Sequence, residues 1–70
     1  MVSKQNELDL HGVRHEDVER LVENFVLLNE PPLRIITGNS DRMRELVTFV
    51  LDRCNIGYEQ FKPSQIIILK

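Results

Sequence analysis

The feature that most constrains the fold of this chain is the order in which two kinds of hydrophobic spacing alternate along it. Helical spacing, with apolar residues three and four positions apart, runs over residues 15–29 and again over 43–54. Short runs rich in branched or alternating apolar residues surround these stretches, at residues 7–11, 33–37, 58–61 and 65–70. The predicted order is therefore strand, helix, strand, helix, strand, strand.

The residues between these segments agree with that order. Pro31 and Pro32 end the first helix, since proline lacks the backbone donor. Residues 38–40 turn the chain towards the second helix, which Asn39 or Ser40 can cap. Gly57 follows that helix, where a left-handed residue is often wanted.

Strand–helix–strand units give parallel pairing, whereas the last two strands can form a hairpin through the turn at residues 62–64. The run at 65–70 is almost wholly apolar, which is typical of a strand that is covered on both faces or lies in the middle of a sheet. We therefore expect an α/β two-layer sandwich, with both helices packed on a mixed four-stranded sheet.

Seventy residues make one small domain, expected over 7–70 after a loose leader at 1–6. Cys54 is the single cysteine, so no intramolecular disulfide forms, and with two histidines it makes no recognisable zinc spacing. No apolar run reaches the ~18 residues of a membrane span, and the N-terminus lacks the apolar centre of a signal peptide. We expect a cytoplasmic protein with no membrane partner.

The net charge is −2, whereas nucleic-acid-binding domains are usually basic. The charges are unevenly placed, with acidic residues concentrated in the first half of the chain and arginines in the middle. A local basic patch can exist despite the negative net charge, and any binding to nucleic acid should be weak and sensitive to salt.

The run Leu8-Asp9-Leu10-His11-Gly12 ends the first expected strand. Side chains alternate across a strand, so Asp9 and His11 share one face. His11 suits general acid–base catalysis, and Asp9 could assist a nucleophile or hold a divalent metal such as magnesium. The alternative is structural: Asp9 caps a helix or braces a loop, and His11 fills a turn.

A second group of residues follows the next strand. The backbone N–H groups of Gly38, Asn39 and Ser40, with the Thr37 hydroxyl beside them, could hold a phosphate at the start of a helix. A simple turn with a helix cap explains the same residues equally well. Because parallel strands end at the same edge of a sheet, three arginines are expected to join this candidate phosphate site: Arg14, Arg42 and Arg44.

The two runs together, each placed between a strand and a helix, resemble the small MutS-related (Smr) domain over nearly the whole chain, as a minimal stand-alone version. The resemblance implies a fold similar in outline to the C-terminal domain of bacterial translation initiation factor three. It also implies binding of DNA or RNA, with DNA-nicking or RNA-cleaving endonuclease activity in several members. The family's functional positions match here at Asp9, His11, Thr37 and Gly38.

Two departures from the family pattern keep an alternative open. Ser40 stands where members commonly carry a second glycine, and the loop after it is short. The alternative is a non-catalytic module that keeps the Smr fold and binds nucleic acid or a protein partner. A small oligomer whose interface completes the core is a third hypothesis.

Overall fold

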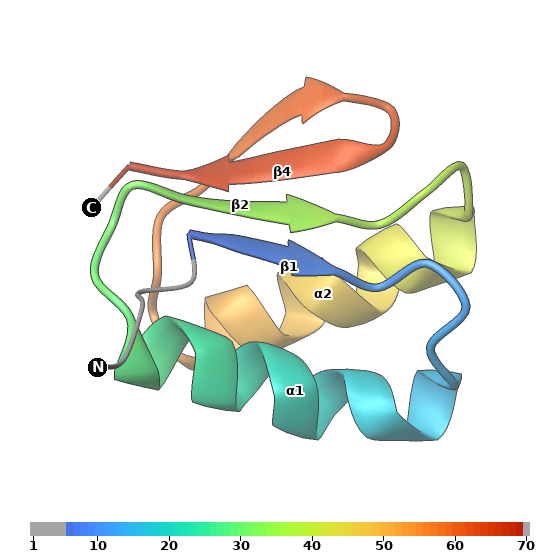
Figure 1. Ribbon diagram of the computed structural model, residues 1–70, viewed down its shortest axis with the longest axis horizontal. Coiled ribbons are helices and arrows are strands. Elements are labelled where there is room, and N and C mark those ends of the chain that lie inside the picture. Colours follow the sequence, from blue (N-terminus) through green and yellow to red (C-terminus); the bar gives the residue numbers. More distant parts are fainter. Residues whose placement is uncertain (1–5, 70) are drawn as a thin grey trace.

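The structure is a computed structural model that describes residues 6–69 (Figure 1). Its elements follow the predicted order: β1 (Glu7–Asp9), α1 (His15–Leu28), β2 (Leu33–Ile36), α2 (Asp41–Arg53), β3 (Glu59–Lys62) and β4 (Gln65–Ile68). The leader expected at 1–6 lies outside the described residues, apart from Asn6. The Asn6 carbonyl accepts a hydrogen bond of 2.8 Å from the Arg34 N–H, so this residue is tied to the sheet.

The four strands form one mixed sheet in the order β1-β2-β4-β3. β1 and β2 are parallel, whereas β4 is antiparallel to both of its neighbours, β2 and β3. The hairpin expected from the last two strands is present, and β4 lies inside the sheet, which explains its apolar sequence. The α/β two-layer prediction is confirmed.

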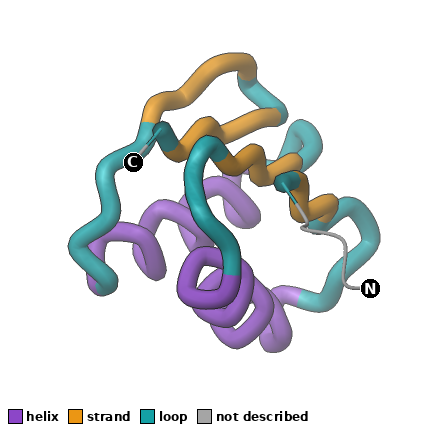
Figure 2. Tube along the Cα trace, turned by 60° about the vertical axis from the view of Figure 1, so that its left-hand side comes forward, coloured by secondary structure: helices purple, strands orange, loops and turns teal. Residues whose placement is uncertain are grey.

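Both helices pack on the same face of the sheet, and no element between residues 6 and 69 covers the opposite face (Figure 2). Alternation along the strands separates the two sets of side chains: Ile35 and Ile66 face the helices and are buried, whereas Arg34 and its neighbour Glu7 face outwards. The buried core holds, from the helices, Val18, Val22, Phe25, Met43, Val47, Val50 and Leu51, and from the sheet and its loops, Leu10, Leu33, Ile35, Ile66 and Ile68.

The end of α2 differs from the prediction. The left-handed residue is Asn55, with φ of 61°, and Gly57 does not have a positive φ. The reason is a bond of 2.9 Å from the Ile56 N–H to the Leu51 carbonyl, which is the long hydrogen bond of a Schellman motif. That bond requires the left-handed conformation at Asn55, the residue before Ile56.

Strand β1 is also shorter than expected, ending at Asp9 instead of His11. Leu10 still donates to the Ile36 carbonyl at 2.9 Å, but its own carbonyl already accepts from Val13 N–H at 3.0 Å to close a turn. Among residues 6–69 no helix is long and apolar enough to cross a membrane.

Candidate functional site

Three segments converge at the end of the sheet where β1 and β2 finish, on the right of Figure 1. Loop A (residues 10–14) joins β1 to α1, and loop B (residues 37–40) joins β2 to α2. Because β1 and β2 are parallel, both loops lie at the same end, and both helices begin there. The β3–β4 turn is the third segment, since Thr37 N–H donates to the Ser64 carbonyl at 2.8 Å.

Asp9, the last residue of β1, and His11 of loop A lie in a compact turn. The Asp9 Oδ1 accepts a hydrogen bond of 2.9 Å from the His11 backbone N–H. Gly12, with φ of 81°, occupies the left-handed conformation that lets the Leu10–Val13 turn close. Both Asp9 and His11 are exposed. The carboxylate therefore braces the loop, as the structural alternative expected, while the imidazole remains accessible to solvent.

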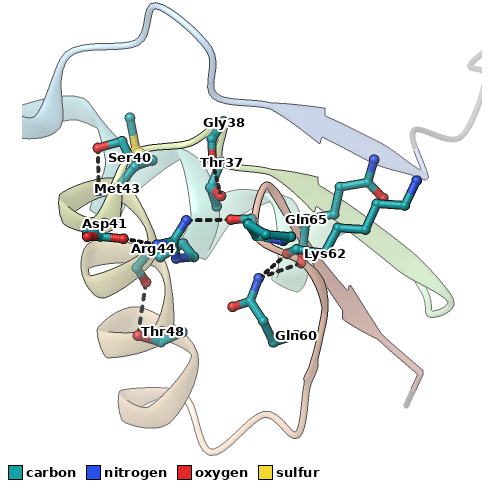
Figure 3. Close-up of polar contacts among 11 residues, drawn as sticks. Thr37, Gly38, Ser40, Asp41, Met43, Arg44, Thr48, Gln60, Lys62 and Gln65 are labelled. Atoms are coloured by element: carbon teal, nitrogen blue, oxygen red, sulfur yellow. Dashed lines mark hydrogen bonds and ion pairs between the residues drawn. The ribbon is translucent and has the colours of Figure 1, made fainter.

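Loop B uses its polar groups internally (Figure 3). Thr37 is buried, and its hydroxyl donates to the Gly38 carbonyl at 3.1 Å. The Ser40 Oγ accepts from Met43 N–H at 3.1 Å, so Ser40 and not Asn39 is the cap of α2. Gly38 has φ of 72°, which again favours glycine. Of this loop's candidate phosphate ligands, Asn39 is the side chain that is exposed at the tip.

The three candidate arginines have different environments. Arg14 and Arg42 have side chains 82% and 66% exposed, and each has a carboxylate neighbour at 3.8 Å, Glu16 and Glu45 respectively. Arg44 is only 23% exposed. Its guanidinium donates to the Pro63 carbonyl and pairs with Asp41, so it connects α2 to the β3–β4 turn (Figure 3). Arg14 and Arg42 are therefore the arginines free to exchange partners, whereas Arg44 is held in place.

Ion pairing limits the positive potential of the site. Every arginine between residues 6 and 69 has a carboxylate partner. Arg53 illustrates the effect on the helix side, where the hydrogen bond that it donates to Glu19 and the charges of Glu19 and Glu23 raise its pKa. A phosphate that binds Arg14 or Arg42 therefore has to compete with Glu16 or Glu45.

The described side chains do not form a resident metal site. Within residues 6–69 no group of three His, Cys, Asp or Glu side chains is placed to hold an ion. Asp9 offers one carboxylate, and one of its oxygens is already bonded to the loop. Mg²⁺ is usually held by one or two carboxylates together with waters and substrate phosphates, so an ion at Asp9 would need a bound phosphate and waters for its other ligands.

Two residues of the β3–β4 hairpin directly precede the turn that contacts loop B, and the sequence analysis did not include them in the site. Phe61 is 62% exposed, and the Lys62 Nζ lies 5.5 Å from the centre of its ring. Lys62 directly precedes Pro63, the residue that Arg44 contacts. The signal was a basic residue beside an aromatic one next to a turn, but only the folded chain brings this turn to loop B.

Tyr58, by contrast, packs against α2. Desolvation on burial raises the pKa of Tyr58, and the charge of Asp52 and a hydrogen bond with it act in the same direction, against a smaller effect of Thr48. The Tyr58 side chain is partly buried against the core.

Comparison with known proteins identifies the fold. The solved structure of the SMR domain of NEDD4-binding protein 2 matches this chain with a TM-score of 0.62 and 26% sequence identity. The match covers 100% of this chain and 91% of that one. No model of a protein family matches the sequence, and no curated protein does. The chain has an Smr-domain fold, which confirms the resemblance drawn from its two sequence runs.

Proposed function

We propose that this chain is an Smr-type domain that binds nucleic acid through loop A, the tip of loop B and the first turn of α2. The observation that carries the proposal is the convergence of Arg14, Asn39 and Arg42 beside two helix N-termini at one end of the sheet. Backbone N–H groups and the helix dipoles favour an anion there, and exposed arginines can exchange a carboxylate for a phosphate.

The binding should be weak and strongly dependent on salt. Within the described residues 6–69, the exposed cations near the three segments are Arg14, Arg42 and Lys62. Two or three phosphate contacts correspond to a slope of about −2 to −3 in log K against log salt on duplex DNA. The contacts go to the backbone, so binding should depend little on sequence.

An NMR titration of labelled protein tests this proposal, with single-stranded, duplex and branched DNA and RNA as separate ligands. We expect shifts at residues 11–14 and 38–42. Charge reversal by Arg14→Glu and Arg42→Glu should abolish them, whereas Arg20→Glu, on α1 in an ion pair with Asp17, serves as the control. Binding that survives the double reversal, or is lost equally with Arg20→Glu, would contradict the proposal.

Endonuclease activity is the finer hypothesis, with His11 as the acid or base and Asp9 beside it. The exposed imidazole at the anion-binding end supports it. The non-catalytic alternative is favoured by the bond from His11 N–H to Asp9, because that bond gives the carboxylate a structural role. A cleavage assay on any bound nucleic acid, with and without magnesium, distinguishes the two hypotheses. Loss of cleavage in His11→Ala with binding retained supports catalysis. The absence of cleavage by the parent protein supports the non-catalytic binding module.

A further inference from the structure

The outer edge of β1 has backbone groups that point away from the sheet. The Asn6 carbonyl and the Leu10 N–H both bond to β2, at 2.8 and 2.9 Å. Residues of a strand that pairs in parallel face the partner alternately, so residues 6, 8 and 10 face β2. The N–H and C=O groups of Glu7 and Asp9 therefore face outwards, and β1 is the end strand of the sheet. Such an edge can pair with an added strand.

A groove lies beside this edge, between β1 and α1. It has a volume of about 190 Å³ and is lined by Leu8, Leu21, Asn24, Phe25, Leu28 and Asn29. The Leu28 side chain on its rim is 79% exposed. In a strand added to β1, every second side chain would point to the helix layer and reach this groove. The lining of this groove favours an apolar side chain.

The other face of an added strand would meet acidic residues. Glu7 and Asp9 lie on the open face of β1, two residues apart, and both are exposed, with Glu7 in a half-exposed ion pair of 3.4 Å with Arg34 that a basic side chain would have to share. Side chains directly opposite them contribute favourably when they are basic and unfavourably when they are acidic. Two copies of β1 paired antiparallel around Leu8 would place Glu7 of one chain opposite Asp9 of the other. The charges therefore disfavour a second copy of this chain and favour a basic segment.

We propose that the outer edge of β1 and the β1–α1 groove bind an extended segment of a partner protein that alternates basic, apolar and basic residues. The apolar side chain enters the groove and the basic ones lie opposite Glu7 and Asp9. This surface is separate from the nucleic-acid contacts at Arg14 and Arg42. The opposite edge of the sheet, β3, is less suited to such addition, because a bulge between Gln60 and Lys62 interrupts its ladder.

The probe for this proposal is the peptide acetyl-Ser-Val-Lys-Leu-Lys-Val-Ser-amide, titrated into ¹⁵N-labelled protein at up to millimolar concentration. We expect shifts at residues 7–9 and at Leu21 and Leu28, with none at Arg42. Strand addition should also slow hydrogen exchange at the Glu7 and Asp9 amides, because these N–H groups gain carbonyl partners. A peptide with glutamates in place of the lysines should bind at least about tenfold more weakly.

Matched variants test the two parts of the surface. Leu28→Ser should weaken binding of the peptide about tenfold. Leu27→Ser should leave the affinity unchanged, because Leu27 is a neighbour on α1 that is 68% exposed and does not line the groove. Glu7→Gln should weaken it about threefold, and Glu59→Gln, at an exposed site on β3, should have no effect. Equal binding of the glutamate peptide, unchanged exchange at Glu7 and Asp9, or equal effects of Leu28→Ser and Leu27→Ser would each overturn the proposal.

Discussion

Loops A and B connect a strand to a helix at the same end of the molecule, yet they differ in how their polar groups are used. In loop B, Ser40 caps α2, and Thr37 is buried with its hydroxyl bonded to Gly38. In loop A, the residue at the equivalent cap position is Arg14, which makes no side-chain cap bond. Loop A keeps its backbone turn closed with Asp9 and leaves His11 and Arg14 exposed.

The difference indicates where each loop contributes. Loop B is a structural connection whose hydrogen bonds hold α2 and the β3–β4 turn in place. Loop A has a weaker helix start and more exposed polar side chains, so it is better suited to ligand binding. Substitutions of polar side chains in loop B should therefore affect stability more, and substitutions of polar side chains in loop A should affect binding more.

The largest difference in stability is expected between alanine substitutions at two arginines of α2. Arg44→Ala removes bonds to the Pro63 carbonyl and to Asp41 from a half-buried side chain, and should lower the free energy of unfolding by about 2 kcal/mol. Arg42→Ala removes an exposed pair at 3.8 Å and should cost about 0.5 kcal/mol or less. Urea unfolding of both variants measures this, and equal costs would show that Arg44 does not connect the two segments.

Next come the two glycines with positive φ. Gly12→Ala and Gly38→Ala should each cost about 1 to 2 kcal/mol, because an alanine is strained in that conformation. A Cβ at either position meets no atom within 4 Å, so no clash adds to that cost. The expected result is two nearly equal losses of stability. A much larger loss at one glycine would indicate tight packing around that loop.

The helix caps should respond in opposite directions. Ser40→Ala removes the bond to Met43 N–H and should destabilise the domain by about 1 kcal/mol. Arg14→Ser introduces a cap where the backbone is already extended (φ −68°, ψ 141°), and should stabilise it by about 0.5 to 1 kcal/mol. Thermal unfolding measures both. If Arg14→Ser lowers the midpoint, the backbone N–H groups at the start of α1 already have another hydrogen-bond acceptor.

The smallest effect on stability should come from His11. His11→Ala leaves the backbone bond to Asp9 in place, so the free energy of unfolding should change by about 0.5 kcal/mol or less. Asp9→Ala removes that bond and should cost somewhat more, about 1 kcal/mol. A large loss of stability in His11→Ala would mean that its ring supports the turn and would weaken its candidacy as a ligand-binding residue.

The parts of the fold set by local patterns were predictable. Helical spacing gave both helices, Pro31 and Pro32 ended the first, and the Ser40 cap follows from a known preference at helix starts. The apolar run at 65–70 predicted a strand that is covered on both faces or lies in the middle of the sheet, and β4 has the second of these positions. Each of these depends on residues that are close in sequence, so the spacing alone carries the information.

The parts set by long-range contacts were not predictable. Arg44 was expected to bind phosphate, but the β3–β4 turn, 19 residues further along, supplies the carbonyl that holds it. Nothing near Arg53 in the sequence marks Glu19 or Glu23 as its partners across the helix layer. The left-handed residue after α2 was predicted to be Gly57, from the preference of glycine for that conformation. Asn55 adopts it instead, because the Ile56–Leu51 hydrogen bond is a stronger determinant than glycine preference.

The two helices run in the same direction, with both N-termini at the loop end of the sheet (Figure 1). With 14 and 13 residues at about 3.5 debye each, their peptide dipoles add to about 90 debye along one axis. A molecule with a net charge of −2 is repelled as a whole by a polyanion, but a dipole of this size produces a torque on it in the polyanion's field. For the nucleic acid of the proposed function, the two helix dipoles therefore favour an approach with the loop end first.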